Sequence, residues 1–105
     1  MRVPEIHPND VGDDLMLDVR EDDEWSLGRA PNSVHIPLYE LPDRFGELPA
    51  DRPLNVVCKV GSRSAQATAW LIANGVEARN VTGGMLLWAQ LGLPVEGDTA
   101  RPWIG

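Results

Sequence analysis

The sequence predicts a three-layer α/β fold, in which a mainly parallel central sheet is flanked by helices. Two observations favour this fold: short apolar runs alternate with helix-forming segments, and proline, glycine or charged residues separate them throughout the 105 residues. Parallel neighbours in a sheet need crossover helices, and the alternation supplies them. A chain of this length suits one core, because two would each be marginal, so we expect a single domain over residues 1–105.

Four segments are predicted to be strands. Residues 15–19 form an apolar run that ends at the charged cluster 20–24, as expected for a buried strand that leaves the core. Residues 33–36 and 54–57 are runs of the same kind, and residues 76–82 form the last predicted strand. Sites in parallel sheets form at the carboxyl ends of strands, so the segments after these runs are candidates for chemistry.

Helix formers fill residues 62–74, and Gly75 stands where a C-terminal cap belongs. This pattern predicts a helix whose apolar face consists of Ala65, Ala69, Ile72 and Ala73. We also expect a less regular helical stretch over residues 38–48, interrupted by Pro42, and a short helix over residues 85–91.

The formal net charge is −7, and the acidity is concentrated in the first half of the chain. Residues 1–50 contain twelve acidic and four basic side chains, whereas residues 51–105 contain four acidic and five basic ones. An acidic protein repels phosphate groups, so we expect no binding to nucleic acid and none to an anionic membrane surface.

Nothing in the sequence indicates a membrane span or export. No apolar run approaches the ~20 residues that a span needs, and the first residues lack the pattern of a secretory signal. Cys58 is the only cysteine, and a cytosol keeps an unpaired thiol reduced more easily than the cell exterior does. We therefore expect a cytoplasmic protein.

The segment from Cys58 to Ser64 joins the predicted strand 54–57 to the predicted helix 62–74. Backbone N–H groups at the start of a helix lack intrahelical partners and can converge on an anion, and the helix dipole adds positive charge there. Because the thiolate is the reactive form of cysteine, this position favours Cys58 as a catalytic nucleophile that is open to solutes.

The neighbours of Cys58 suit an anionic substrate. Lys59 and Arg63 add two positive charges, and the planar donors of Arg63 fit an oxyanion such as the sulfonate end of thiosulfate. Gly61 can take a positive φ and let amides come close, and Ser62 or Ser64 can cap the helix or donate a hydroxyl to the sulfur. The predicted substrate-binding residues are Lys59, Val60, Gly61, Ser62, Arg63 and Ser64.

These motifs resemble the rhodanese-like domains over nearly the whole chain. The resemblance rests on residues 17–21, residues 28–37, the loop from Cys58 to Ser64, and Gly83-Gly84 followed by Trp88. Rhodanese active-site loops have four residues between the cysteine and the arginine, as this chain does. The related phosphatases and arsenate reductases have five, a loop sized for phosphate or arsenate, so the loop length favours sulfur chemistry.

The resemblance implies a sulfurtransferase. Cys58 would accept a sulfane sulfur from thiosulfate or another small-molecule donor, hold it as a persulfide and pass it to a thiol or cyanide acceptor. It implies no metal and no organic cofactor. Two alternatives stay open: a sulfur-relay or binding module that serves a sulfur-acceptor protein, and a phosphatase or arsenate reductase on the same scaffold.

Several other polar residues are interpreted as structural. Asp18 and Arg20 form a charged pair at a strand end, which more often anchors a loop than catalyses a reaction. The acidic run 22–24 is interpreted as a solvated helix start, and Gly83-Gly84 as a backbone turn. Arg29 stands where many rhodanese-like domains have a histidine, so any hydrogen bond of that histidine is in question.

Overall fold

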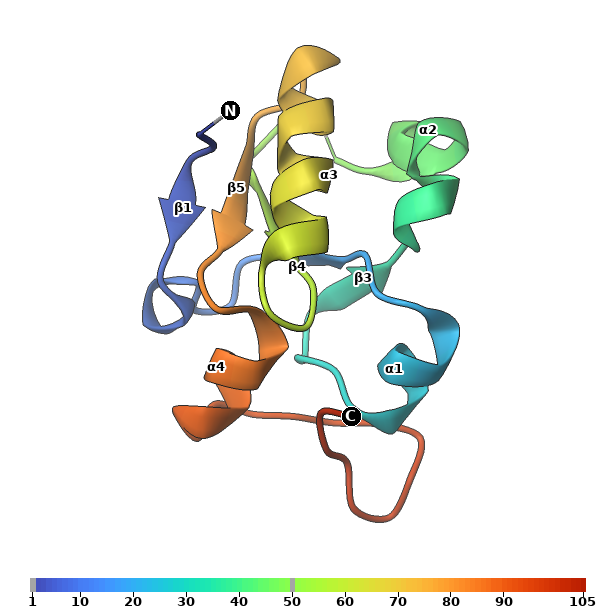
Figure 1. Cartoon of the computed structure of the whole chain (residues 1–105), viewed down its shortest axis with the longest axis vertical. Coiled ribbons are helices and arrows are strands. Elements are labelled where there is room, and N and C mark those ends of the chain that lie inside the picture. The colour runs from blue at the N-terminus through green and yellow to red at the C-terminus, as the bar shows by residue number, and fades with distance from the viewer. Residues whose placement is uncertain (1, 50) are drawn as a thin grey trace.

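The computed structural model describes residues 2–49 and 51–105 and contains a five-stranded sheet (Figure 1). Its strands are β1 (Glu5–Ile6), β2 (Met16–Asp18), β3 (Ser33–His35), β4 (Leu54–Val57) and β5 (Ala78–Val81). Their order across the sheet is β1-β5-β4-β2-β3, and every neighbouring pair is parallel. The predicted parallel α/β fold is confirmed, and β4 is its central strand.

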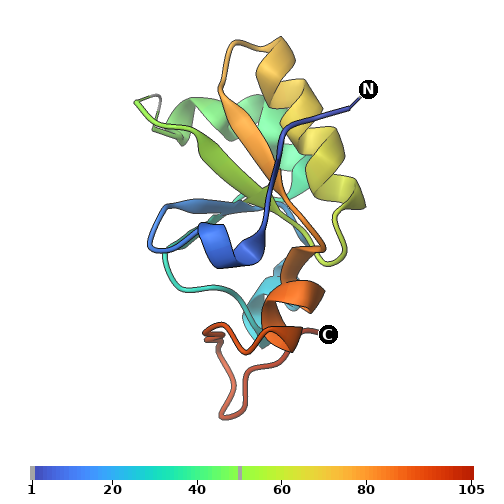
Figure 2. The same cartoon turned by 90° about the vertical axis from the view of Figure 1, so that its left-hand side faces the viewer.

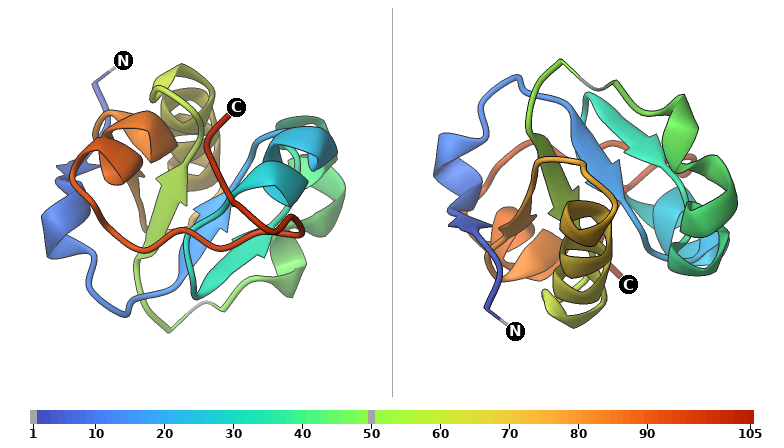
Figure 3. Two further views of the ribbon diagram at one scale, coloured as in Figure 1. Left: turned by 90° about the horizontal axis from the view of Figure 1, so that it is seen from below. Right: turned by 90° about the horizontal axis from the view of Figure 1, so that it is seen from above.

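Helices lie on both sides of this sheet. The α-helices are α1 (Asp22–Leu27), α2 (Leu41–Arg44), α3 (Ser62–Ala73) and α4 (Gly84–Gln90), and the 3-10 turns are η1 (Pro8–Asp10), η2 (Leu38–Glu40) and η3 (Phe45–Glu47). Figures 2 and 3 show α2 and α3 on one side, with η1, α4 and the C-terminal segment on the other. In the described parts of the chain, no helix is long and apolar enough to cross a membrane.

Each face of the sheet has its own apolar core. Successive side chains of a strand point to opposite faces, so β2 and β4 supply both cores. On one face, Leu17 and Val56 pack with residues of α2 and α3. On the other face, Met16 and Val57 pack with residues of α4 and its surroundings. Burial on both faces explains why these strands read as continuous apolar runs in the sequence.

Strand β1 was not predicted, because two residues are too few to show a period. It is held by neighbours that lie far along the chain. The Asn80 N–H donates to Pro4 O at 2.8 Å, and the Thr82 N–H donates to Ile6 O at 2.9 Å. The strand therefore exists through its pairing with β5 rather than through its own propensity.

The predicted apolar face of α3 is wrong. Ile72 and Ala73 are exposed, and the buried residues of the helix are Ser64, Ala67, Thr68 and Leu71. The inward hydroxyls have partners, since Thr68 Oγ1 donates to Ser64 O at 2.7 Å. Polar groups can lie in a core when they are hydrogen-bonded, and here one of them faces the candidate site.

Asp18 and Arg20 form an ion pair with fully buried side chains. Arg20 Nη2 donates to Asp18 Oδ2 at 2.7 Å and to Gly28 O at 2.7 Å, and Arg20 Nε donates to Asp18 Oδ1 at 2.9 Å. These bonds tie the end of β2 to the end of α1. The geometry agrees with the interpretation of the two residues as a structural pair.

Arg29 connects α1 to the C-terminal segment. Its Nη2 donates to Asp98 Oδ1 at 2.8 Å, and its guanidinium carbon lies 4.8 Å from the centre of the Trp25 ring. The Arg29 N–H also donates to Glu96 O at 2.7 Å. Arg29 therefore anchors residues 96–98 against the domain.

Candidate active site

The predicted loop leaves the carboxyl end of β4 and leads into α3 (Figure 1). Cys58 directly follows β4, and Gly61 is the N-cap residue of α3 with a φ of 112°. A residue with a side chain rarely adopts this backbone conformation, so glycine suits the turn that brings the Gly61 N–H back toward the cysteine. The loop lies where parallel sheets place their sites.

Two donors contact the sulfur of Cys58. The Gly61 N–H lies 3.1 Å from Sγ, and Ser64 Oγ lies 3.2 Å from it. Ser64 is buried in the first turn of α3, whereas Ser62 is exposed, so Ser64 is the serine beside the sulfur. Both groups can donate a hydrogen bond, which suits a sulfur that carries negative charge.

Asn80 of β5 holds both of these donors, and sequence reasoning missed it. Its Oδ1 lies 2.5 Å from Ser64 Oγ, and its Nδ2 donates to Gly61 O at 3.2 Å and to Glu5 Oε2 at 2.9 Å. A hydroxyl has only one proton to donate. Ser64 donates it to Asn80 Oδ1 while the Cys58 thiol is protonated. The hydroxyl can rotate to donate to Sγ when the sulfur is an anion. Asn80 thereby links the unpredicted strand β1 to the site.

The start of α4 holds the backbone of the loop from the other side. The Met85 N–H donates to Cys58 O at 2.8 Å, and the Leu86 N–H donates to Lys59 O at 3.0 Å. Gly84 has a φ of 62°, and a Cβ on it would collide with both of these carbonyl groups. The turn interpreted as structural in the sequence therefore has a second effect, which is to fix the position of the cysteine backbone.

Replacement of Gly84 by alanine should cost stability and activity together. We expect a loss of about 2–3 kcal/mol in the free energy of unfolding, because the new Cβ meets backbone and the φ is unfavourable. Gly92→Ala is the matched control, since its φ is 74° and nothing lies within 4 Å of its Cβ. Urea unfolding of both variants measures the difference, and equal losses would contradict the close approach at Gly84.

The structure pairs Arg63 with Glu24 of α1. The Nη1 and Nη2 atoms of Arg63 lie 2.7 and 2.9 Å from the two carboxylate oxygens of Glu24. The side chains are 33% and 19% exposed, respectively. Glu24 also accepts a hydrogen bond from the Glu21 N–H at 2.9 Å, which completes a capping box at the start of α1. The interpretation of residues 22–24 as solvated is therefore wrong for Glu24.

The charges of the pair stabilise each other. Hydrogen bonds from Arg63 hold the pKa of Glu24 at about 2, well below its ordinary value of 4.5. Hydrogen bonds to Glu24 in turn raise the pKa of Arg63. The pair is therefore ionised throughout the neutral range, and a substrate anion must share Arg63 with Glu24.

The stability that this pair contributes should depend on pH. Because the folded-state pKa of Glu24 is lowered, the contribution is complete above pH 4.5 and is lost as the pH falls toward about 2. We expect Glu24→Gln to lower the free energy of unfolding at neutral pH by about 1–2 kcal/mol, after screening by solvent is allowed for. Urea unfolding of both proteins should then converge near pH 2, and a constant difference across this range would contradict the pair.

Cys58 is buried in this structure with no exposed fraction, which corrects the expectation of a sulfur open to solutes. Val60, two residues further on, is 56% exposed, so the outer side of the loop faces solvent. A donor can therefore reach Sγ only if side chains or backbone of the loop move.

Among residues 2–49 and 51–105, no carboxylate forms an ion pair with the half-buried Lys59.

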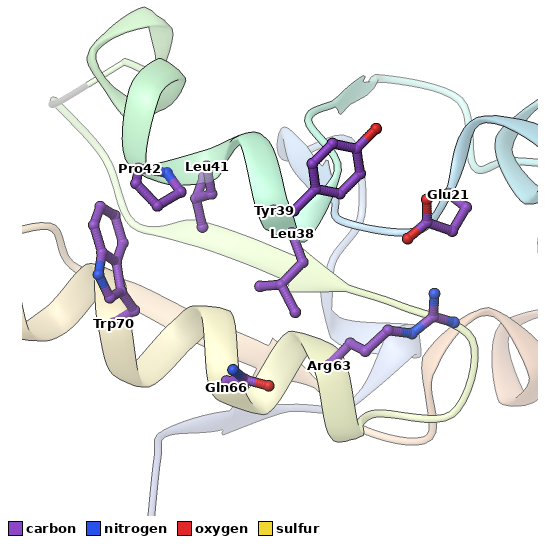
Figure 4. Close-up of a pocket in the computed structure, with 8 residues that line it drawn as sticks. All are labelled: Glu21, Leu38, Tyr39, Leu41, Pro42, Arg63, Gln66 and Trp70. Carbon is purple, nitrogen blue, oxygen red and sulfur yellow. The ribbon is translucent and has the colours of Figure 1, made fainter.

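A pocket of about 420 Å³ lies beside the loop, and Figure 4 shows Arg63 at one end of it and Trp70 at the other. The pocket is lined by Glu21, Leu38, Tyr39, Leu41, Pro42, Arg63, Gln66 and Trp70. Its volume falls in the range of small-molecule sites, and most of its lining is apolar. Arg63 is the one predicted site residue that lines it.

The family model of the rhodanese-like domain matches residues 6–91, which is most of the chain. The chain belongs to the rhodanese-like domain family. The match includes every site residue described above except Glu5.

Relatives of this rhodanese-like domain carry names from sulfur chemistry. A sulfurtransferase from Allochromatium vinosum is 37% identical over 87 residues, which cover 82% of this chain and 81% of the relative. The thiosulfate sulfurtransferase GlpE from Pseudomonas syringae is 35% identical over 75 residues, or 70% of this chain and 71% of the relative. These similarities support a role in sulfur transfer.

A solved structure agrees with the fold. The rhodanese-related protein from Thermoplasma volcanium has a TM-score of 0.84 and 34% sequence identity, and the match covers 89% of this chain and 97% of that one. The rhodanese-like domain described here therefore spans nearly the whole of that smaller relative.

Proposed function

We propose that this rhodanese-like domain moves sulfane sulfur from thiosulfate or a persulfide donor to a thiophilic acceptor through a persulfide on Cys58. The single observation that carries the proposal is the contact of Sγ with two hydrogen-bond donors, the Gly61 N–H and the Ser64 hydroxyl. We also treat residues 1–105 as one domain, since all five strands belong to one sheet.

In the first half of the cycle the Cys58 thiolate attacks the outer sulfur of the donor. With thiosulfate, a bond forms between Sγ and the outer sulfur, the sulfur–sulfur bond of thiosulfate breaks, and its electron pair leaves with sulfite. The product is a Cys58 persulfide anion. The Gly61 N–H and the Ser64 hydroxyl can stabilise a sulfur anion because both already lie within hydrogen-bond distance of Sγ in the folded protein.

In the second half of the cycle an acceptor nucleophile attacks the outer sulfur of the persulfide. Cyanide would leave as thiocyanate and a thiolate would leave as a new persulfide, and in both cases the electron pair of the broken bond returns to Sγ. The residues proposed to bind the donor are Lys59, Val60, Gly61, Ser62, Arg63 and Ser64. No partner cysteine inside the chain competes for the persulfide, because Cys58 is the only cysteine.

Two alternatives predict different products. A phosphatase or arsenate reductase on this scaffold would need room for a tetrahedral oxyanion, and the four-residue spacing from Cys58 to Arg63 argues against it. A sulfur-relay module would use the same persulfide but deliver it to a carrier protein. The relay differs from the leading proposal in its acceptor and not in its chemistry at Cys58.

A product assay separates these functions. Thiosulfate and cyanide should yield sulfite and thiocyanate in equal amounts, with no release of phosphate from a phosphate ester. Hydrolysis of the ester without thiocyanate would overturn the proposal in favour of a phosphatase. Slow turnover with cyanide but rapid transfer of the persulfide sulfur to a carrier protein would favour the relay module.

A further inference from the structure

The positive charge of Arg63 is balanced inside the protein. Both terminal nitrogens of the guanidinium are bonded to the carboxylate of Glu24, at 2.7 and 2.9 Å. A bidentate pair of this kind is the strong form of the arginine–carboxylate contact, and its net charge is zero. An approaching anion therefore meets a neutral pair where the sequence predicted a free cation.

The surroundings of this pair are unfavourable to a dianion. Glu21 also lines the pocket, and Figure 4 shows it at the same end as the guanidinium of Arg63, where it adds a negative charge. Lys59 is the loop cation without a carboxylate partner in the described parts of the chain. Thiosulfate carries two negative charges, so it gains little electrostatic attraction from the pocket side of the loop.

The same pocket offers contacts to a carbon skeleton. Its lining includes the apolar side chains of Leu38, Leu41 and Trp70. Burial of apolar area stabilises a bound organic group, whereas the sulfonate of thiosulfate has no carbon to bury. The volume of about 420 Å³ suits a small organic molecule and is too small for a folded partner.

We propose that Glu24 is a specificity-determining residue, which neutralises Arg63 and so favours small organic persulfides over thiosulfate as sulfur donors. The carbon body of the donor would occupy the pocket between α3 and residues 38–42. Its outer sulfur would reach Cys58 when the loop moves, because Cys58 is fully buried. This inference rests on the proposed function, and it names the substrate class of that site.

The sulfur-transfer step with such a donor is balanced. The Cys58 thiolate attacks the outer sulfur of R–S–SH, and a bond forms between Sγ and that sulfur. The sulfur–sulfur bond of the donor breaks, and its electron pair leaves on R–S⁻. The transferred sulfur keeps its proton, so the products are Cys58–S–SH and the organic thiolate, with the same total charge as the reactants.

The test compares two donors, benzyl persulfide and thiosulfate, in three proteins. Glu24→Gln removes the neutralising charge but keeps a side chain able to close the capping box. We expect it to raise kcat/KM for thiosulfate about tenfold at low ionic strength, and to change kcat/KM for benzyl persulfide less than about threefold. The gain for thiosulfate should shrink as salt is added.

Asp23→Asn is the matched control, because it removes one negative charge from the same turn of α1 and Asp23 has no bond to Arg63. It should change kcat/KM for either donor less than about twofold, as a solvent-exposed charge is screened. Equal effects of Glu24→Gln on both donors, or equal effects of the two substitutions, would overturn the inference alone. If no protein takes sulfur from either donor, the proposed function itself is overturned.

Discussion

Replacement of Cys58 by serine is expected to abolish sulfur transfer, with a loss of at least ~10³-fold in kcat/KM. A serine hydroxyl at this position keeps the contacts with the Gly61 N–H and Ser64, but it cannot form a persulfide. Initial rates with thiosulfate or an organic persulfide as donor, and cyanide as acceptor, provide the measurement.

The folded state of the Cys58→Ser variant should survive, which makes the loss of activity informative. Serine is close in size to cysteine and finds donors already placed at 3.1 and 3.2 Å from the sulfur. We expect the free energy of unfolding to change by about 1 kcal/mol or less. A folded variant that still transfers sulfur would show that another group carries it.

Loss of Arg20 is expected to have the largest effect on stability. Its ion pair with Asp18 is fully buried, and Arg20→Ala would leave the carboxylate without its partner. Breaking a buried pair in this way costs about 3–5 kcal/mol, which is a large part of the ~5–15 kcal/mol of a typical domain. Urea unfolding monitored by tryptophan fluorescence measures it.

Two further variants keep this prediction testable if Arg20→Ala does not fold. Asp18→Asn combined with Arg20→Met removes both charges and should lose less stability than Arg20→Ala alone. Arg44→Ala breaks solvent-accessible ion pairs with Glu40 and Glu47 and should cost less than about 1 kcal/mol. If Arg20→Ala proved no more costly than Arg44→Ala, the buried pair would not be the anchor described above.

The features predicted well from the sequence are local. The strand 54–57 and the helix that follows Cys58 begin where expected, because an apolar run and a change to helix formers are visible within a few residues. The loop sequence also predicted that Ser62 or Ser64 could donate to the sulfur, and the structure shows that Ser64 is the one beside it. Backbone donors at a helix start depend on sequence-adjacent residues, so a single segment is enough to predict them.

The features that the sequence did not reveal join distant segments. Glu24 and Arg63 are 39 residues apart, and Ser64 and Asn80 are 16 apart. Their contacts depend on how α1 and β5 pack around the loop, and no local pattern encodes that packing. The consequence is functional, because the partner of Arg63 decides how much of its charge reaches a substrate.

The mistaken face of α3 has a related cause. The buried face of the helix was predicted from apolar residues such as Ile72. In the structure Ile72 is exposed, and the buried side chains include Ser64 and Thr68. A polar residue can be buried when a neighbour satisfies it, and the neighbour of Ser64 is the cysteine sulfur together with Asn80. The departure from the apolar pattern therefore coincides with the candidate active site.

The complete burial of Cys58 bears on how the site works. Donors reach the buried sulfur only when the loop moves, and small donors need the smallest displacement. This requirement and the limited volume of the adjacent pocket both favour small sulfur donors. A carrier protein could then receive sulfur only by presenting a narrow, extended group to the loop.

The most direct measurement of the central claim is the intact mass of the protein after treatment with a sulfur donor and removal of excess reagent. We predict a gain of one sulfur atom, located on Cys58 by peptide mapping and removed by cyanide with return of the original mass. An unchanged mass with every sulfane donor, or a gain of sulfur that persists in Cys58→Ser, would contradict the account.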